Sequence, residues 1–252
     1  HGGLFKGLIE NLVNKVQVFG LYFATLDIRQ NSLIHTQVWE SLANEGVSVA
    51  KNYISQDADM KMKFLGNIEP STVRVITDEM AKETLNSIRA MKTIQEENGE
   101  AGCNRYIISH CNSALQVMEL YGLFVLGGWQ PNEITADIVP LFETIEDLRN
   151  ASQIMKTLYE DKTYGQHLKR RNMRQTVMLG FSDGSKDGGY LMGNWSIYKA
   201  KEMITELSRT YQVDVIFFDG RGGPPSRGGG KTNRFYASMG KNIAQKEIQV
   251  TI

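Results

Sequence analysis

The 252-residue sequence has little cysteine, no net charge and no long hydrophobic run. Its two cysteines are too few for the disulfide framework of a secreted domain, which predicts a cytoplasmic protein with reduced thiols. The 28 Lys and Arg are balanced by 28 Asp and Glu, which argues against a protein that mainly coats nucleic acid or an anionic membrane. No apolar run reaches the roughly 18 residues that a membrane span requires.

The sequence also lacks an initiator Met and a signal-peptide pattern. It ends on the strand-like alternation 247–252, with no turn or cap after it. We therefore expect a segment of a longer polypeptide. Hydrophobic residues make up 41% of the chain, which is enough for a substantial core, and no long-period repeat or linker divides it. The prediction is one domain segment over residues 1–252.

Apolar runs of strand length alternate with amphipathic helical patterns along the whole chain. After a first strand that ends the apolar run 19–28, strands are predicted at 73–76, 106–108, 138–142, 176–179 and 213–218. Helical patterns include 4–13, 38–42, 77–98, 115–121, 144–158 and 195–204. Connections that contain a helix of ten or more residues indicate parallel strands joined by βαβ crossovers.

This order fits both an open doubly wound sheet and a (β/α)8 barrel. A polar residue is expected just past the end of five different strands: Arg29, His110, Glu143, Asp183 and Arg221. A barrel gathers such strand ends into one ring, whereas an open sheet spreads them along a line. We therefore predict an α/β fold, a partial (β/α)8 TIM-like barrel with additional helices.

The strongest local signal is the glycine-rich segment 219–231, with the sequence DGRGGPPSRGGGK. Glycines permit positive φ angles and a close approach of backbone N–H groups to an anion. Arg221, Arg227 and Lys231 add cationic donors that suit phosphate or carboxylate. The position directly after a buried strand favours an anion site over a flexible surface loop. An RNA-binding RGG segment is a weaker alternative, because there are only two copies in a neutral chain.

A second signal is the segment 181–189, which carries Asp183 and Lys186 between a strand and a helix. Asp183 suits a hard divalent cation and Lys186 an anionic substrate, although an ordinary loop with an N-cap Asp fits equally well. Glu143 closes an apolar strand and, together with Asp183, would supply the one or two carboxylates that Mg²⁺ usually takes. Arg29 fits either this pocket or a salt bridge with a nearby acid.

Other reactive side chains are weaker candidates. His35 and His110 are interpreted as hydrogen-bonded structural residues rather than bases. Cys103 and Cys111 have neither CxxC spacing nor a nearby basic cluster, so we expect unreactive thiols.

Five motifs occur in the order found in phosphoenolpyruvate carboxylases, and the resemblance runs from about Val18 to the end of the chain. They are LDIRQNS at 26–32, YIIS at 106–109, VPLFETIEDL at 139–148, VMLGFSDGSKDGG at 177–189 and GRGG…RGGG at 220–230. Family members are several times longer, largely helical, and contain an eight-stranded barrel. The resemblance implies that this chain is the central part of that catalytic barrel.

The resemblance also implies an activity. Family members add bicarbonate to phosphoenolpyruvate with Mg²⁺ or Mn²⁺, giving oxaloacetate and phosphate through carboxyphosphate and the enolate of pyruvate. The residues that match the metal ligands are Glu143 and Asp183. Those that match the phosphoryl site are Arg29 and Arg221, with the backbone of Gly222 and Gly223. Further anion-side positions, for bicarbonate or carboxyphosphate, are Arg227 and Lys186.

One residue departs from the family pattern. Asp219 stands where the family usually has His before the Gly-Arg-Gly-Gly motif, and a carboxylate there would repel bicarbonate unless it is paired, for example with Arg221 or Arg227. We therefore include Asp219 among the candidate catalytic residues. The family's N-terminal catalytic His and its later arginines are not located in this sequence, so we expect the isolated segment to be inactive.

The resemblance implies a parent homotetramer that uses phosphoenolpyruvate and bicarbonate, without nucleic acid or membrane partners. The alternative from another class is a non-catalytic segment that binds an anion or RNA through its Gly/Arg loop.

Overall fold

The computed structural model describes residues 3, 5–20, 22–71, 73, 76–220, 230–244 and 246–251, without the side chains of 58–59, 182–187 and 232. The parallel strands are β1 (Asp27–Asn31), β2 (Arg105–Ser109), β3 (Asp137–Phe142), β4 (Arg174–Gly180), β5 (Asp214–Gly220) and β6 (Ile248–Val250). The helices before β2 are α1 (Lys6–Phe19), α2 (Ser32–Asn44), α3 (Ser48–Ile54), α4 (Ala58–Gly66), α5 (Glu79–Asn98) and the 3₁₀ turn η1 (Glu100–Gly102). Those after β2 are α6 (Ala114–Leu126), α7 (Ile145–Glu160), α8 (Lys162–Arg170), α9 (Ser182–Thr210) and α10 (Thr232–Ala237).

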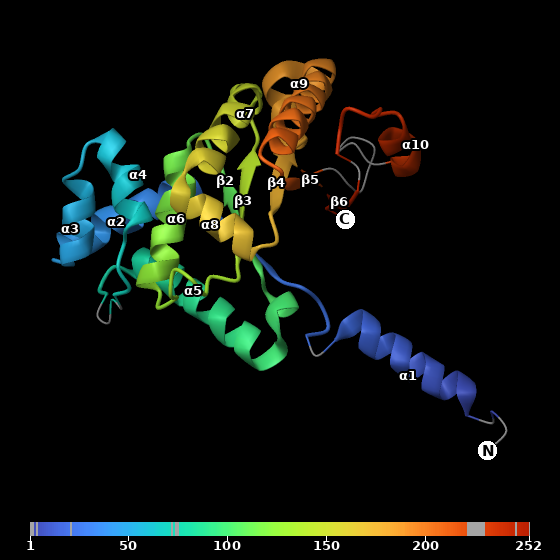
Figure 1. Ribbon diagram of the computed structural model, residues 1–252, viewed down its shortest axis with the longest axis horizontal. Coiled ribbons are helices and arrows are strands. Elements are labelled where there is room, and N and C mark those ends of the chain that lie inside the picture. The colour runs from blue at the N-terminus through green and yellow to red at the C-terminus, as the bar shows by residue number, and fades with distance from the viewer. Residues whose placement is uncertain are drawn as a thin grey trace.

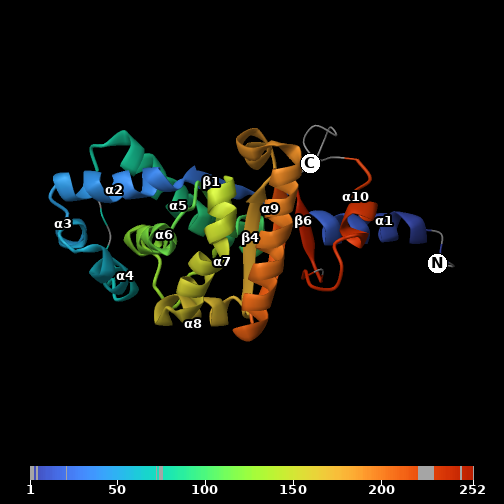
Figure 2. The same cartoon turned by 90° about the horizontal axis from the view of Figure 1, so that it is seen from above.

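The six strands form one parallel sheet in the order of the sequence, β1 to β6 (Figure 1). Each crossover advances by one strand, and the strand order never reverses. Because parallel crossovers share one hand, an unreversed order places all the crossover helices on the same face. Figure 2 shows α7 and α9 side by side along that face. The predicted α/β class is confirmed, and the reversal of strand order that defines a doubly wound sheet does not occur among these strands.

The sheet is strongly curved. Arg105 on β2 donates from Nη1 to Oε1 of Gln249 on β6 at 2.6 Å, although three strands lie between them. In a flat sheet four interstrand spacings would separate these strands by roughly 19 Å. The inner face must therefore curl so that β2 and β6 approach each other, as in an open part of a barrel.

The two faces of the sheet have different cores. Five strand residues form a small cluster on the concave inner face: Ile107, Val139, Leu141, Met178 and Phe218. The alternate strand residues, such as Ile108 and Phe217, join the large core with the helices. This division follows from the two-residue period of a strand, and it explains why the central strands read as continuous apolar runs.

Helix boundaries follow local capping chemistry. Asp78 caps α5 by accepting a hydrogen bond from the N–H of Ala81, and the helix ends before Gly99, which has φ 92°. Thr144 and Asp147 form a reciprocal capping box at the start of α7. These boundaries confirm both predicted ends of α5 and the predicted start of α7, because the required side chains are local in sequence.

The structure corrects three local predictions. Strand β1 occupies the polar string 27–31 and not the apolar run before it, so Arg29 lies in the middle of the strand rather than past its end. Because most of its side chains are polar, β1 contains no apolar run from which a strand would be predicted. Val73 and Ile76 lie outside any strand, whereas 74–75 fall outside the described residues. The predicted loop 181–189 is largely helical, because α9 begins directly at Ser182 and is kinked at Gly189.

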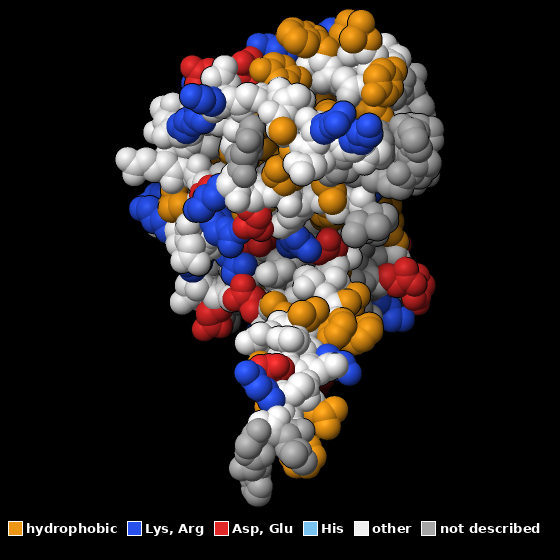
Figure 3. Space-filling view, turned by 90° about the vertical axis from the view of Figure 1, so that its right-hand side faces the viewer, with side chains coloured by type: hydrophobic (Ala, Val, Ile, Leu, Met, Phe, Trp, Pro, Cys, Tyr) orange, Lys and Arg blue, Asp and Glu red, His pale blue; other side chains and the backbone are white. Residues whose placement is uncertain are grey.

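Helix α1 lies apart from the sheet and buries none of its residues (Figure 1). Its apolar side chains, including Leu8, Ile9 and Leu12, are exposed. In Figure 3, hydrophobic side chains are visible along the projecting lower part of the molecule. None of the helices in the described part of the chain combines the length and apolar character needed to cross a membrane.

Two buried histidines predict a pH-dependent stability. Burial lowers the pKa of both His35 and His167 to about 3, from an ordinary value of 6.5. Below pH 6.5 the unfolded chain therefore binds protons that the folded chain excludes, and the free energy of unfolding falls as the pH drops towards 3, by up to about 1.4 kcal/mol per pH unit for each histidine.

Urea unfolding at several pH values measures this slope. In the double variant His35→Gln/His167→Gln the slope between pH 6 and 4 should be shallower than in the wild type, and the two proteins should share the same slope above pH 7. An identical acid slope in both proteins would contradict the role of these histidines.

Candidate active site

Glu143 lies at the carboxyl end of β3, and its side chain is almost completely buried, with 4% exposed. Its backbone N–H and that of Thr144 point to Oδ2 of Asp147, at 3.4 and 3.0 Å. The capping box of α7 therefore fixes the backbone of Glu143. Glu143 follows Leu141 by two residues, and Leu141 lies on the inner face of the sheet. Because side chains alternate along a strand, the carboxylate of Glu143 points to the same face.

Arg29, from the middle of β1, and Glu143, just after β3, form an ion pair on the inner face of the sheet. Nη2 of Arg29 donates to Oε1 of Glu143 at 2.8 Å. The Arg29 side chain is 49% exposed, so its guanidinium retains donors that face solvent while it compensates the buried acid. The register of β1 with β2 pairs Arg29 with Ile107, which places both on the inner face.

His110 completes this cluster at the end of β2. Its backbone N–H donates to Oε2 of Glu143 at 3.1 Å, and its Nε2 lies 3.4 Å from the same oxygen. The residue has φ 51°, a conformation that favours glycine, and the Oγ of Ser32 donates to its carbonyl at 2.7 Å. The hydrogen bonds to Glu143 and Ser32 stabilise the strained backbone of His110. His110 was interpreted as a structural residue, whereas its ring lies beside the site carboxylate.

Two glycines lie at the ends of β4 and β5, and one of them packs against Glu143. Gly180 and Gly220 are register partners. A Cβ at Gly180 would lie 3.1 Å from Cγ and 3.2 Å from Cα of Glu143, and one at Gly220 would lie 3.0 Å from the carbonyl oxygen of Leu179. The absence of a side chain at Gly180 therefore lets the end of β4 approach the acid closely.

Asp219 lies near the carboxyl end of β5, on the face of the sheet opposite to Glu143. It is in register with Leu179, which belongs to the helix-side core, and its carboxylate is buried. Its Oδ2 accepts from Nζ of Lys201 at 2.6 Å and from the hydroxyl of Tyr236 at 2.5 Å. In the described part of the chain the cation beside this acid is therefore Lys201, from α9. The expected partners Arg221 and Arg227 lie outside the described residues.

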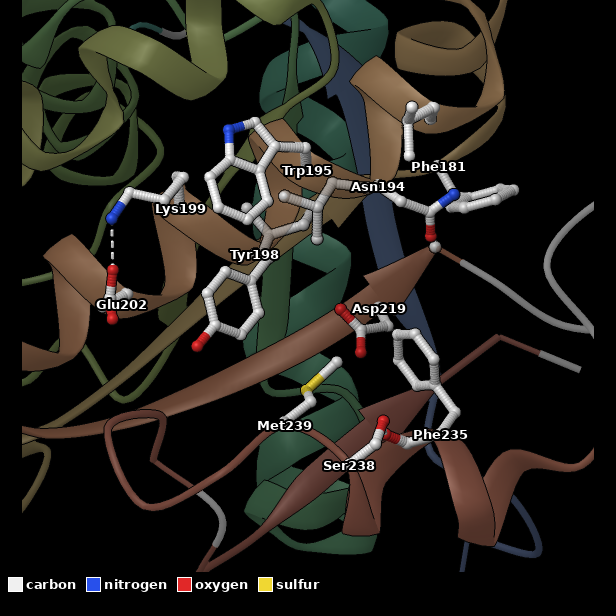
Figure 4. A pocket seen from close by; sticks show the side chains of 14 residues that line it. Phe181, Asn194, Trp195, Tyr198, Lys199, Glu202, Asp219, Phe235, Ser238 and Met239 are labelled. Carbon is white, nitrogen blue, oxygen red and sulfur yellow. Dashed lines mark hydrogen bonds and ion pairs between the residues drawn. The ribbon is translucent and has the colours of Figure 1, made fainter.

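A pocket of about 570 Å³ lies beside Asp219, between α9, the ends of β4 and β5, and α10. Figure 4 shows Asp219 among Trp195, Tyr198 and Phe235, and Trp195 stacks on Tyr198 with ring centroids 5.8 Å apart. The wall of this pocket is mainly apolar, and the pocket lies on the helix side of the sheet. It is thus distinct from the inner-face site around Glu143.

At the carboxyl ends of the strands, the carboxylate of Glu143 is the described inner-face group that could bind a cation. Its hard oxygen donors fit the carboxylate part of the ligand set of Mg²⁺. Among the described side chains, no group of three or more His, Cys, Asp or Glu is arranged around a metal position. The side chains of Asp183 and Lys186, the second predicted ligand and an anion-side residue, lie outside the described part.

A sequence model of the phosphoenolpyruvate carboxylase family matches residues 1–252. The chain belongs to the phosphoenolpyruvate carboxylase family. It is 32% identical to the phosphoenolpyruvate carboxylase of Gloeobacter violaceus over 252 residues, which cover 96% of this chain and 27% of that protein. It is also 32% identical to the enzyme of Nitrosomonas eutropha, over 98% of this chain and 28% of the relative. The chain thus spans little more than a quarter of the length of these relatives.

The structure brings together Arg29 and Glu143 and places Asp219 apart from them, on the helix side of β5. Arg221, Gly222, Gly223 and Arg227 lie outside the described residues. Sequence reasoning missed Lys201 and Gly180. A signal for Lys201 was present, because Ile197, Lys201, Ile204 and Ser208 follow one helical face and all are buried.

The unreactive character expected of the cysteines agrees with their surroundings. Cys103 and Cys111 are both buried free thiols. Burial raises the pKa of Cys103 and raises that of Cys111 to about 12, which keeps both in the protonated form.

We predict that Gly180→Ala will destabilise the protein by about 1–3 kcal/mol, because the new methyl group would be forced against the fixed backbone and side chain of Glu143. Urea unfolding measures the change. The matched control is Gly7→Ala in the exposed helix α1, where a Cβ meets no atom within 4 Å and should be neutral or slightly stabilising. Equal effects of the two substitutions would contradict close packing at Gly180.

Proposed function

We propose that this chain is the central part of the catalytic barrel of an enzyme that carboxylates phosphoenolpyruvate with bicarbonate, producing oxaloacetate and inorganic phosphate. Membership of the family supports the reaction class. The observation that carries the proposal is the Arg29–Glu143 pair, which joins residues 114 positions apart at one end of the sheet. A barrel enzyme places its chemistry at this end.

Arg29 suits the phosphoryl group of the substrate. Its side chain is half exposed on the inner face, and the guanidinium has five N–H donors, so it can donate to phosphate oxygens without leaving Glu143. Preorganised cations stabilise charge that develops on a transferred phosphoryl group, and Arg29 is held in place before substrate arrives. Arg221, with the backbone of Gly222 and Gly223, is proposed to complete the phosphoryl site, and Arg227 and Lys186 to bind bicarbonate.

Glu143 would hold Mg²⁺ or Mn²⁺ together with Asp183. Such a cation, when bound, supplies Lewis-acid stabilisation of the enolate oxygen. The chain's own contribution is a buried carboxylate whose position is fixed by Asp147, Arg29 and the backbone N–H of His110. Asp219 faces the helix layer, so its buried charge is directed away from this anion-binding face.

A binding segment for RNA or another anion is not favoured, because the chain has a net charge of zero and matches the carboxylase family along its whole length. The tetrameric state of the parent protein remains part of this proposal.

The reaction is tested in the longer polypeptide that carries residues 1–252, by coupling oxaloacetate formation to NADH oxidation. We expect turnover by the longer polypeptide and none by the isolated segment. In the longer polypeptide, Arg29→Gln should lower kcat/KM by about 100-fold or more, because it removes a charged donor to the phosphoryl group. Turnover by the segment alone would contradict its dependence on other parts, and wild-type kinetics in Arg29→Gln would contradict the role of this residue.

Metal binding is tested by Mn²⁺ titration of the longer polypeptide. Glu143→Gln and Asp183→Asn should each weaken binding by about tenfold or more, because a neutral amide replaces a charged oxygen ligand. The control is Glu146→Gln, three residues from Glu143 but exposed, which should leave the affinity unchanged. If Glu143→Gln binds Mn²⁺ as tightly as the control does, the assigned ligand is wrong.

A further inference from the structure

Lys201 and Asp219 form a buried ion pair between the sheet and its helix layer. Their side chains are 1% and 4% exposed, and Nζ of Lys201 lies 2.6 Å from Oδ2 of Asp219. Nζ also lies 5.4 Å from the ring centre of Phe217 and 5.5 Å from that of Tyr236. Both charges are therefore removed from water and meet each other among aromatic rings.

Removing only one partner of a buried ion pair lowers the stability of the protein. An uncompensated buried charge destabilises a protein strongly, whereas replacing both partners by neutral groups is often tolerated. The hydroxyl of Tyr236 adds a second donor to the same carboxylate oxygen, at 2.5 Å. The contacts of Lys201 and Tyr236 therefore stabilise the ionised carboxylate of Asp219, and that carboxylate compensates the charge of Lys201.

The three residues come from elements on both sides of the glycine-rich segment. Lys201 is on α9, Asp219 is the penultimate residue of β5, and Tyr236 is on α10. In the sequence, β5 precedes the glycine-rich segment and α10 follows it, so the Asp219 carboxylate joins the element before this segment to the element after it. Thr251 beyond β6 also donates its N–H to the carbonyl of Asp219, at 3.2 Å.

We propose that Lys201 is a positioning residue, which together with Tyr236 holds the Asp219 carboxylate on the helix side of β5 and thereby fixes β5 and α10, the described elements before and after the glycine-rich segment, relative to each other. The neighbouring Gly220 then faces Gly180 and the inner site, whereas the acid at 219 faces away from it. Lys201 is thus the compensating charge for an acid next to a site for anions. This inference rests on the proposed function for its kinetic part, but not for the ion pair itself.

Hydrogen–deuterium exchange of the longer polypeptide tests the ion pair without reference to catalysis. In Lys201→Met, peptides that cover β5 and α10 should exchange roughly 100-fold faster or more, because Asp219 loses its buried partner. The double variant Lys201→Met/Asp219→Asn should return to within about tenfold of the wild type, because neither charge is then present. The control Lys199→Met breaks the partly exposed pair with Glu202 on the same helix and should leave exchange of β5 and α10 unchanged.

Steady-state kinetics of the same variants test positioning. Lys201→Met should raise the KM for phosphoenolpyruvate by about tenfold or more with a smaller change in kcat, because β5 and α10, which flank the proposed anion-binding segment, lose their fixed relative positions. The double variant should restore the KM to within about threefold of the wild type. Tyr236→Phe removes one hydroxyl and keeps the ring, so it should raise the KM by a smaller factor. This variant replaces Lys201→Met in the experiment if Lys201→Met does not fold.

Three results would overturn the proposal: wild-type exchange in Lys201→Met, a double variant no better than the single one, or faster exchange with an unaltered KM. The last result would make Lys201 a purely structural residue. If the wild-type polypeptide forms no oxaloacetate, the proposed function fails, whereas the exchange result still decides whether the ion pair holds β5 and α10 together.

Discussion

Each strand of a parallel sheet turns successive side chains to opposite faces, and the architecture of this chain depends on that alternation. On the inner face the even spacing of Val139, Leu141 and Glu143 leads from an apolar cluster to a buried carboxylate. On the other face, Phe217 and Asp219 lead from the helix-packed core to a buried ion pair. A shift of register by one residue would exchange the two faces and separate Glu143 from Arg29.

The inner-face site combines rigid support with an accessible cationic side chain. Glu143 is fixed by the capping box of α7, by Arg29 and by the backbone of His110. Gly180 packs closely against it, whereas the side chain of Arg29 is half exposed. A buried acid compensated by an accessible cation suits the binding of anions whose charge changes during reaction.

Asp219 shows how an apparent conflict in sequence is resolved by packing. A carboxylate beside an anion-binding segment is unfavourable if it faces the anion. Because its strand directs it to the helix layer, it is instead neutralised by Lys201 and Tyr236. The same contact joins the elements that precede and follow the glycine-rich segment, so charge compensation and backbone placement depend on one set of atoms.

The sequence by itself determined the α/β class, the helix caps at Asp78 and Thr144, the family, and Glu143 as a strand-end acid, because periodicity and capping are local properties. It did not reveal β1, whose polar residues obscure a strand, nor the face on which Asp219 lies, because β5 is apolar on both sides. Only the tertiary structure decided these points. Register, sheet curvature and the pairing of Lys201 with Asp219 depend on contacts between residues that are distant in sequence or separated by a whole element, and such contacts have no local signature.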